Sequence, residues 1–143
     1  MLLIDAHLDL AMNALNWDRN LDLDVYEIRQ AEADMIAKGR GRGTVSLPEL
    51  RKAEVGVCLA TVIDRTARPG NPMPGSACQE ISYAKAQGQL AYYRVLEAQG
   101  KVRLIDNVDR WSHGGSENIY LDGDGRHPAY LRGIGGEVLC EVW

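Results

Sequence analysis

The sequence predicts an α/β protein that corresponds to the first part, about three βα units, of a (β/α)8 TIM barrel of the metal-dependent hydrolase type. Two apolar runs, 2–6 and 55–63, are continuous rather than alternating, which is typical of strands buried on both faces of a parallel sheet. Segments with helical spacing separate them, and a third short apolar run lies at 101–105. This alternation places the helices outside a parallel sheet. Three strands are too few to close a barrel.

The first helix is expected after the first strand, from Asp24 to Gly39. Asp24 is a suitable N-cap, and apolar residues recur at helical spacing at Ile28, Ala31 and Met35. Gly39 provides the stop.

A shorter helix is expected from Ser46. Ser46 is the N-cap, Pro48 lies in the first turn, and Glu49 follows three residues after the cap, which together predict a capping box. The strand at 55–63 comes next, and within it Cys58 is expected to be a small core residue.

A long helix is expected from Ser76 to Gly100. The residues that share one of its faces are Ile81, Ala84, Gly88, Ala91, Tyr92 and Val95. After the strand at 101–105 the pattern changes, because glycines become frequent and no periodicity is sustained. We therefore expect a partial barrel over residues 1–111 and an irregular tail over 112–143.

Composition limits the classes of function. The 143 residues are 45% hydrophobic and 25% charged, as in a globular domain. The net charge of −4 argues against nucleic-acid binding through phosphates. The three cysteines lack CxxC spacing, which suits a reducing compartment. No apolar run is long enough to span a membrane, and the first strand leaves no room for a signal peptide, so we expect a cytoplasmic protein.

His7 and Asp9 are the candidate metal ligands. Residues two apart on a strand face the same side, so an imidazole nitrogen and a carboxylate oxygen can converge on one divalent cation, zinc above all. They end the first strand, where α/β barrels build their active sites. Asp5 is a candidate second ligand or orienting group. The alternative interpretation is that Asp9 caps the following segment and His7 is its hydrogen-bond neighbour.

The remaining histidines, His113 and His127, lie in the tail. The segment "DGDGRH" (122–127) is similar to a calcium loop but lacks its spacing and its closing glutamate. There is no P-loop, dinucleotide fingerprint or GxSxG motif.

Two segments carry a family resemblance. "LLIDAHLDLAMNALNWDRNL", followed by "GRGTVSLPELRKAEVGVCLATVI", resembles the N-terminal part of the membrane (renal) dipeptidase family of metallopeptidases, and its soluble bacterial members in particular. The matching features are the Asp-x-His-x-Asp-Leu opening, the "VSLPELRKAEVG" segment before a strand, and the long helix before "VRLI". The resemblance covers residues 1 to about 111.

The resemblance implies a (β/α)8 barrel more than twice as long as this chain. Such enzymes hold two zinc ions bridged by a glutamate and hydrolyse dipeptides, often with a D-residue in second position. By position, His7 and Asp9 match the first-strand ligands of one zinc. The bridging glutamate is not visible, the later histidine ligands would lie beyond residue 143, and neither His113 nor His127 stands in a ligand context of the family. We therefore expect a partial zinc site and an inactive isolated chain.

The tail has a testable explanation. A one-base shift within the codons of "IYLDGDGRHP" permits a Leu-Met-Glu-x-Ala-Asp-Ile-Pro string, which would be the missing strand. We hypothesise that the chain after about residue 115 is out-of-frame translation. A nucleotide sequence that cannot encode this string would contradict the hypothesis.

Two other functional interpretations stay open: a non-catalytic stub or interaction fragment, and another metal-dependent hydrolase with an amidohydrolase-like barrel. The partner implied by the resemblance is a small dipeptide substrate. Open barrel edges and uncovered apolar helix faces also predict homo-oligomers or aggregation.

Overall fold

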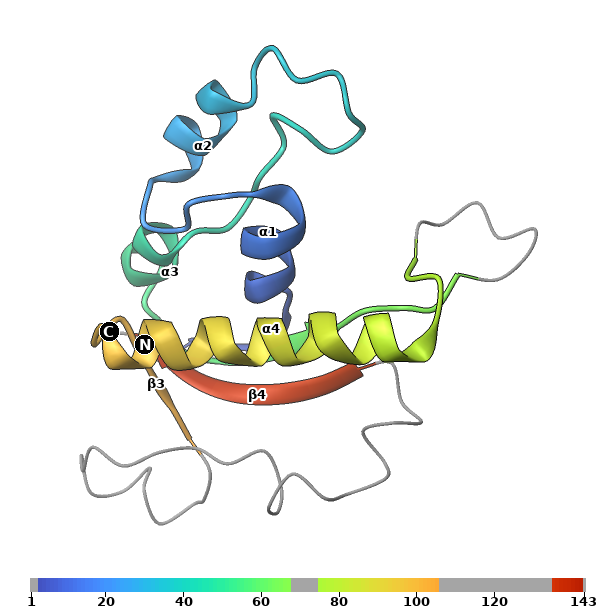
Figure 1. Ribbon diagram of the computed structural model, residues 1–143. Helices are drawn as coiled ribbons and strands as arrows, with labels where there is room; N and C mark the ends of the chain where they lie inside the picture. Colours follow the sequence, from blue (N-terminus) through green and yellow to red (C-terminus); the bar gives the residue numbers. More distant parts are fainter. Residues whose placement is uncertain (1–2, 68–74, 106–134, 143) are drawn as a thin grey trace.

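A computed structural model describes residues 3–67, 75–105 and 135–142. The described chain forms one four-stranded sheet, and the four helices lie above strand β4 in the view of Figure 1. The predicted α/β class is confirmed. No helix of the described residues is long and apolar enough to cross a membrane.

The three predicted strands are present. They are β1 (Leu3–Leu8), β2 (Val55–Ile63) and β3 (Val102–Leu104). The sheet order is β1-β2-β4-β3, with β1 parallel to β2 and β4 antiparallel to both of its neighbours. The three predicted strands therefore run in the same direction, but only β1 and β2 are parallel neighbours, because the antiparallel β4 lies between β2 and β3. The barrel itself stays a prediction.

Strand β4 (Gly135–Val142) corrects the expectation of an irregular tail over 112–143, at least for this segment. It pairs with β2 from Val57 to Ile63 and with β3 from Val102 to Leu104. Without it, one edge each of β2 and β3 would present unpaired backbone N–H and C=O groups, which are costly to leave unsatisfied. The rest of the tail, including His113 and His127, lies outside the described residues.

The helices are α1 (Leu10–Trp17), α2 (Val25–Ala31), α3 (Leu47–Lys52) and α4 (Gln79–Ala98). Sequence patterns did not predict α1. The helix predicted from Asp24 to Gly39 corresponds to α2. Its predicted end is wrong, because α2 ends at Ala31 and Met35, expected on its apolar face, is 50% exposed. Gly39 instead forms a turn with φ of 94°, close against the ring of Trp17.

The two expected N-caps differ in outcome. Asp24 caps α2 as predicted, since its Oδ1 accepts the N–H groups of Tyr26 and Glu27 at 2.8 and 2.9 Å. The capping box expected at Ser46 does not form. The Ser46 Oγ is buried without a hydrogen-bond partner, and Glu49 pairs instead with a lysine one turn later.

Helix α4 confirms the predicted long helix, but it begins at Gln79, with Cys78 rather than Ser76 at the N-cap position, and it buries a different face. Two residues of the face predicted from apolar spacing, Ile81 and Val95, are 44% and 50% exposed. The buried residues of α4 are Gln89, Leu90, Tyr93 and Leu96.

Polar side chains explain this orientation of α4. The Gln89 amide meets both backbone groups of Ile63: the Ile63 N–H donates to Oε1 at 2.8 Å, and Nε2 donates to the Ile63 carbonyl at 2.7 Å. The Tyr93 hydroxyl donates to the carbonyl of Thr61 at 2.9 Å and accepts the N–H of Ala11 at 3.1 Å. A search for apolar spacing misses this face, because two of its central positions are polar residues that bond to a buried strand.

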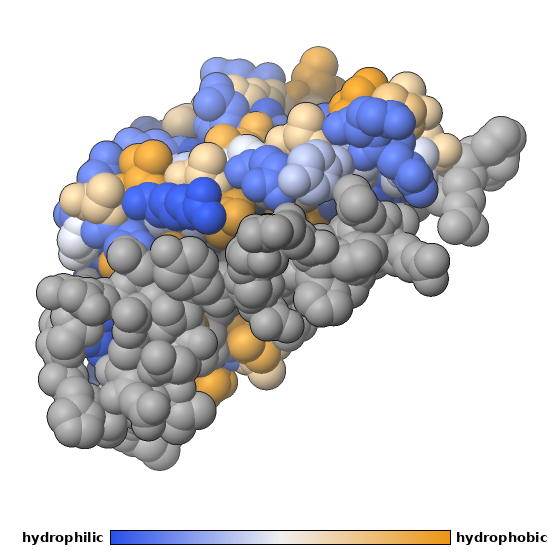
Figure 2. Space-filling view, turned by 60° about the horizontal axis from the view of Figure 1, so that its bottom comes forward, coloured by the Kyte–Doolittle hydropathy of each residue, from blue (hydrophilic) through white to orange (hydrophobic). Residues whose placement is uncertain are grey.

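The core lies between the sheet and these helices. Cys58 is fully buried there, as predicted, beside the most buried large side chains, Tyr93, Leu10, Leu21, Leu47 and Leu104. Hydrophobic residues also reach the surface, where Figure 2 shows them scattered among hydrophilic ones. The prediction that the first strand is buried on both faces is wrong, because β1 contains no fully buried residue and Leu3 and Ile4 are 43% and 57% exposed. Self-association through such surfaces stays a prediction.

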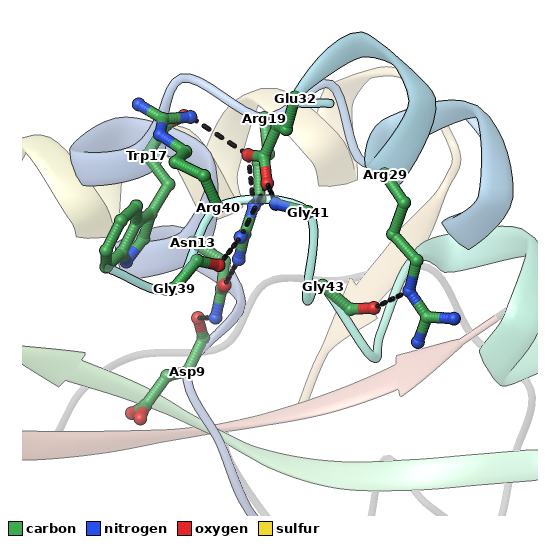
Figure 3. A network of polar contacts seen from close by, with 10 residues as sticks. All are labelled: Asp9, Asn13, Trp17, Arg19, Arg29, Glu32, Gly39, Arg40, Gly41 and Gly43. Carbon is green, nitrogen blue, oxygen red and sulfur yellow. Dashed lines mark hydrogen bonds and ion pairs between the residues drawn. The ribbon is translucent and has the colours of Figure 1, made fainter. Parts of the chain in front are cut away.

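A buried carboxylate, Glu32, holds the segment after α2 against the end of α1 (Figure 3). Arg19 binds it through two parallel hydrogen bonds, Nε to Oε1 at 2.8 Å and Nη2 to Oε2 at 3.0 Å. Arg40 Nη1 adds a bond of 2.9 Å, and the N–H of Gly41 adds one of 2.7 Å. Both arginines also lie over the ring of Trp17, at 5.3 and 5.2 Å from its centroid. Both carboxylate oxygens therefore have charged partners, which offsets the cost of burial.

Replacing Glu32 should destabilise the fold. Glu32→Gln leaves the nearly buried Arg19 without a counter-charge, so we expect the free energy of unfolding to fall by roughly 3 kcal/mol. Urea denaturation at pH 7 measures this. The exposed Asp34→Asn is the control, with a change within about 0.5 kcal/mol. Equal stability of Glu32→Gln and the unmodified chain would contradict the role given to this network.

The same carboxylate predicts acid sensitivity. The hydrogen bond from Arg19 lowers the pKa of Glu32 from its usual 4.5 to about 2, against the opposing effect of burial. Because the folded-state pKa lies below the unfolded one, this stabilisation is present above about pH 4.5 and is lost as the pH falls toward 2. Over that window, the unfolding free energy of the unmodified chain should fall more steeply than that of Glu32→Gln.

Replacing Gln89 should also destabilise the fold. Gln89→Leu keeps the apolar contacts of this 1% exposed side chain but leaves the N–H and C=O of Ile63 without the partner they have here. We expect a loss of about 2 to 4 kcal/mol in urea denaturation. The exposed Gln87→Leu on the same helix is the matched control. Similar effects of the two substitutions would show that these bonds contribute little.

Candidate metal centre

The structure brings His7 and Asp9 together at the carboxyl end of β1. Asp9 lies between β1 and α1, at the N-cap position of the helix. The His7 Nε2 atom is 3.5 Å from the Asp9 Oδ1 atom. The His7 side chain is 63% exposed and that of Asp9 is 29% exposed, so solvent reaches the pair.

The strand that carries the pair is irregular. Asp5 pairs with Cys58 and Leu8 with Ala60, so β1 contains one more residue than β2 between these two positions. Such a bulge breaks the simple alternation on which the prediction was based, and bulges beside functional sites re-aim side chains. The two side chains meet even though His7 lies inside the bulge.

Asp5 does not join the pair as a ligand. Its Oδ1 accepts the backbone N–H of His7 at 2.9 Å, so it contacts the backbone of the bulge rather than the imidazole. Within the described part of the chain, no three His, Cys, Asp or Glu side chains are grouped as a metal site requires.

Contacts from other elements fix Asp9. Thr61 on β2 is 4% exposed, and its hydroxyl donates a short hydrogen bond to Asp9 Oδ1. The backbone carbonyl of Asp9 accepts both the N–H of Asn13, at 3.0 Å, and its side-chain Nδ2, at 2.8 Å. Asp9 occupies the N-cap position with His7 beside it, as the alternative interpretation expected, but its side chain makes no capping bond to α1.

The buried Glu32 network reaches this site through one more side chain, as Figure 3 shows. Arg19 Nη1 donates to Asn13 Oδ1 at 2.6 Å, which fixes the orientation of the Asn13 amide, whose nitrogen then faces the carbonyl of Asp9. Sequence reasoning missed Asn13, because an isolated asparagine four residues after a candidate ligand carries no distinguishing pattern. It also missed Thr61, which is separated from Asp9 by 52 positions.

A separate polar cluster follows β2. Asp64 Oδ2 accepts the hydroxyl of Ser76 at 2.5 Å, and Lys85 Nζ lies 3.9 Å from Asp64 Oδ1. Gly75 allows the close return of the chain here, since a Cβ would lie 2.8 Å from two backbone atoms of the facing segment. This cluster closes the loop after β2 and adds no ligand to His7 and Asp9.

The spacing of the pair fits one zinc ion. Two ligands at about 2.1 Å from a tetrahedral zinc lie roughly 3.4 Å apart. The His7 Nε2 to Asp9 Oδ1 distance is 3.5 Å. The mixed nitrogen and oxygen donors also suit zinc. The two side chains are therefore compatible with one edge of a zinc coordination sphere.

Comparison of the chain with family models, with curated proteins and with solved structures gave no match.

Removing the hydroxyl of Thr61 should weaken metal binding. Thr61→Val keeps the shape of this buried residue but loses the donor to Asp9. Because groups that orient a metal ligand typically contribute tenfold or more to affinity, we expect the zinc dissociation constant to rise about tenfold in calorimetric titration. Thr44→Val, on the exposed surface, is the control. An unchanged affinity in Thr61→Val would show that Asp9 is oriented without this bond.

Proposed function

We propose that this chain provides the first-strand half of a zinc site of the dipeptidase type, with His7 and Asp9 as ligands. The observation that carries the proposal is their spacing of 3.5 Å at the carboxyl end of a strand in a parallel pair. The sequence resemblance to membrane dipeptidases supports zinc as the metal and dipeptides as the substrate class. The proposed reaction is hydrolysis of the peptide bond of a dipeptide in a binuclear site.

The two side chains have different supports. The Asp9 carboxylate accepts the Thr61 hydroxyl, and its backbone carbonyl accepts the Asn13 amide, so both parts of the residue have partners before any ligand arrives. His7 is held through its backbone N–H by Asp5, while its ring is open to solvent. A bound zinc would supply Lewis acidity toward the scissile carbonyl and an activated water. Asp9 is thus the preorganised ligand and His7 the adjustable one.

Two protein ligands are fewer than a catalytic zinc site normally has. Catalytic zinc is normally held by three protein ligands, with a further position for water or substrate. His7 and Asp9 supply two of these. We therefore propose weak zinc binding without turnover for the chain alone, and dipeptidase chemistry only where the remaining ligands are present.

The test is zinc titration of the purified chain, together with hydrolysis of dipeptides carrying an L- or D-residue in second position. We expect binding at one site and no turnover. His7→Ala and Asp9→Ala should each weaken zinc binding at least tenfold, since each removes a ligand. Asp34→Ala and the His113→Ala/His127→Ala double variant are the controls and should bind as the unmodified chain does.

Two results would overturn the proposal. One is the absence of zinc binding, which would favour a non-catalytic fragment. The other is binding that survives loss of His7 and Asp9 but not of the two tail histidines, which would place the metal elsewhere. Turnover by the isolated chain would contradict the expectation that further ligands are required.

A further inference from the structure

The start of helix α1 is capped in an unusual way. Asp9 occupies its N-cap position, and an aspartate there normally accepts the N–H of the second or third helical residue. Asp24 does this at the start of α2, with bonds of 2.8 and 2.9 Å. Asp9 makes no such bond. The same residue type at the same helical position thus behaves differently in the two helices.

A tyrosine from another element takes the place of the Asp9 side chain. The N–H of Ala11, the second residue of α1, donates to the Tyr93 hydroxyl at 3.1 Å. Ala11 and Tyr93 are both fully buried, so this N–H has no access to solvent and needs a protein partner. The hydroxyl proton is directed to the carbonyl of Thr61 at 2.9 Å, which leaves an oxygen lone pair for Ala11.

The same threonine links the two arrangements. Its carbonyl accepts the Tyr93 hydroxyl, and its own hydroxyl donates to Asp9 Oδ1. The Asp9 carboxylate lies beside Thr61 and His7 and makes no bond back onto the helix. A carboxylate engaged in capping would turn its oxygens toward backbone N–H groups and away from a metal.

We infer that Tyr93 is a positioning residue for the metal ligand Asp9: it takes over the cap of α1 and so keeps the Asp9 carboxylate directed at His7. The part of this inference that concerns zinc rests on the proposed function. The part that concerns the cap does not, and it can be measured in metal-free protein.

The first experiment is hydrogen exchange of the Ala11 amide, followed by NMR without metal. Asp9→Ala should leave the exchange rate of Ala11 unchanged, because Tyr93 is its acceptor. Asp24→Ala is the matched control and should accelerate exchange of the Tyr26 and Glu27 amides, since there the aspartate is the cap. Acceleration at Ala11 in Asp9→Ala would show that Asp9 caps α1 in solution and would overturn the inference.

The second experiment uses Tyr93→Phe, with the neighbouring Tyr92→Phe as the control. We expect Tyr93→Phe to weaken zinc binding about tenfold, because Asp9 turns to cap the vacated N–H, and Tyr92→Phe to have no effect. Adding Asp9→Ala to Tyr93→Phe should accelerate Ala11 exchange, although Asp9→Ala alone does not. A merely structural role for the hydroxyl would not create this dependence on Asp9, and its absence would overturn the inference.

The two proposals fail separately. If the unmodified chain binds no zinc, the proposed function is wrong, while the exchange measurements still decide whether Tyr93 or Asp9 caps α1. If zinc binds and Tyr93→Phe leaves the affinity unchanged, the positioning role is wrong and the zinc site stands. If Tyr93→Phe does not fold, the exchange rate of the Ala11 amide in Asp9→Ala still shows whether Asp9 caps α1.

Discussion

Strand β2 continues past the end of β1, and its backbone there must find other partners. The last pair between the two strands joins Leu8 and Ala60. Beyond it, side chains of α4 take over: Tyr93 bonds to Thr61, and Gln89 bonds to both backbone groups of Ile63. Buried N–H and C=O groups have to be satisfied, so this constraint fixes which face of α4 meets the sheet. The apolar residues of α4 then pack around those bonds.

Helix α1 is held on one side by α4 and on the other by the buried Arg19–Glu32 pair. On the sheet side, the Tyr93 hydroxyl bonds to its first turn at Ala11. On the other side, the buried pair of Arg19 and Glu32 reaches Asn13, whose amide bonds to the carbonyl of Asp9. The junction between β1 and α1 is therefore held by contacts from several distant segments. A short helix without a side-chain N-cap of its own depends on such contacts.

This rigidity matters for the proposed metal site. A contact between His7 and Asp9 at a solvent-exposed strand end would contribute little stability by itself, so the bond from Thr61 to the Asp9 carboxylate is not needed to maintain that contact. Such a bond would suit the proposed role of Asp9, because metal affinity depends on ligands that are already oriented.

The sequence by itself determined the presence of β1, β2, β3 and the long helix α4, because these depend on local apolar runs and helical spacing. It also pointed to His7 and Asp9, but the two side chains meet across a bulge that the spacing argument did not include. Tertiary structure decided the position of β4, the early end of α2, the buried face of α4 and the direction of the Asp9 carboxylate. Each of these depends on a partner far along the chain, as Asp9 does on Thr61, 52 positions away. Local pattern does not encode such partners, because hydrogen bonds to a buried strand and buried charges override propensity and apolar spacing.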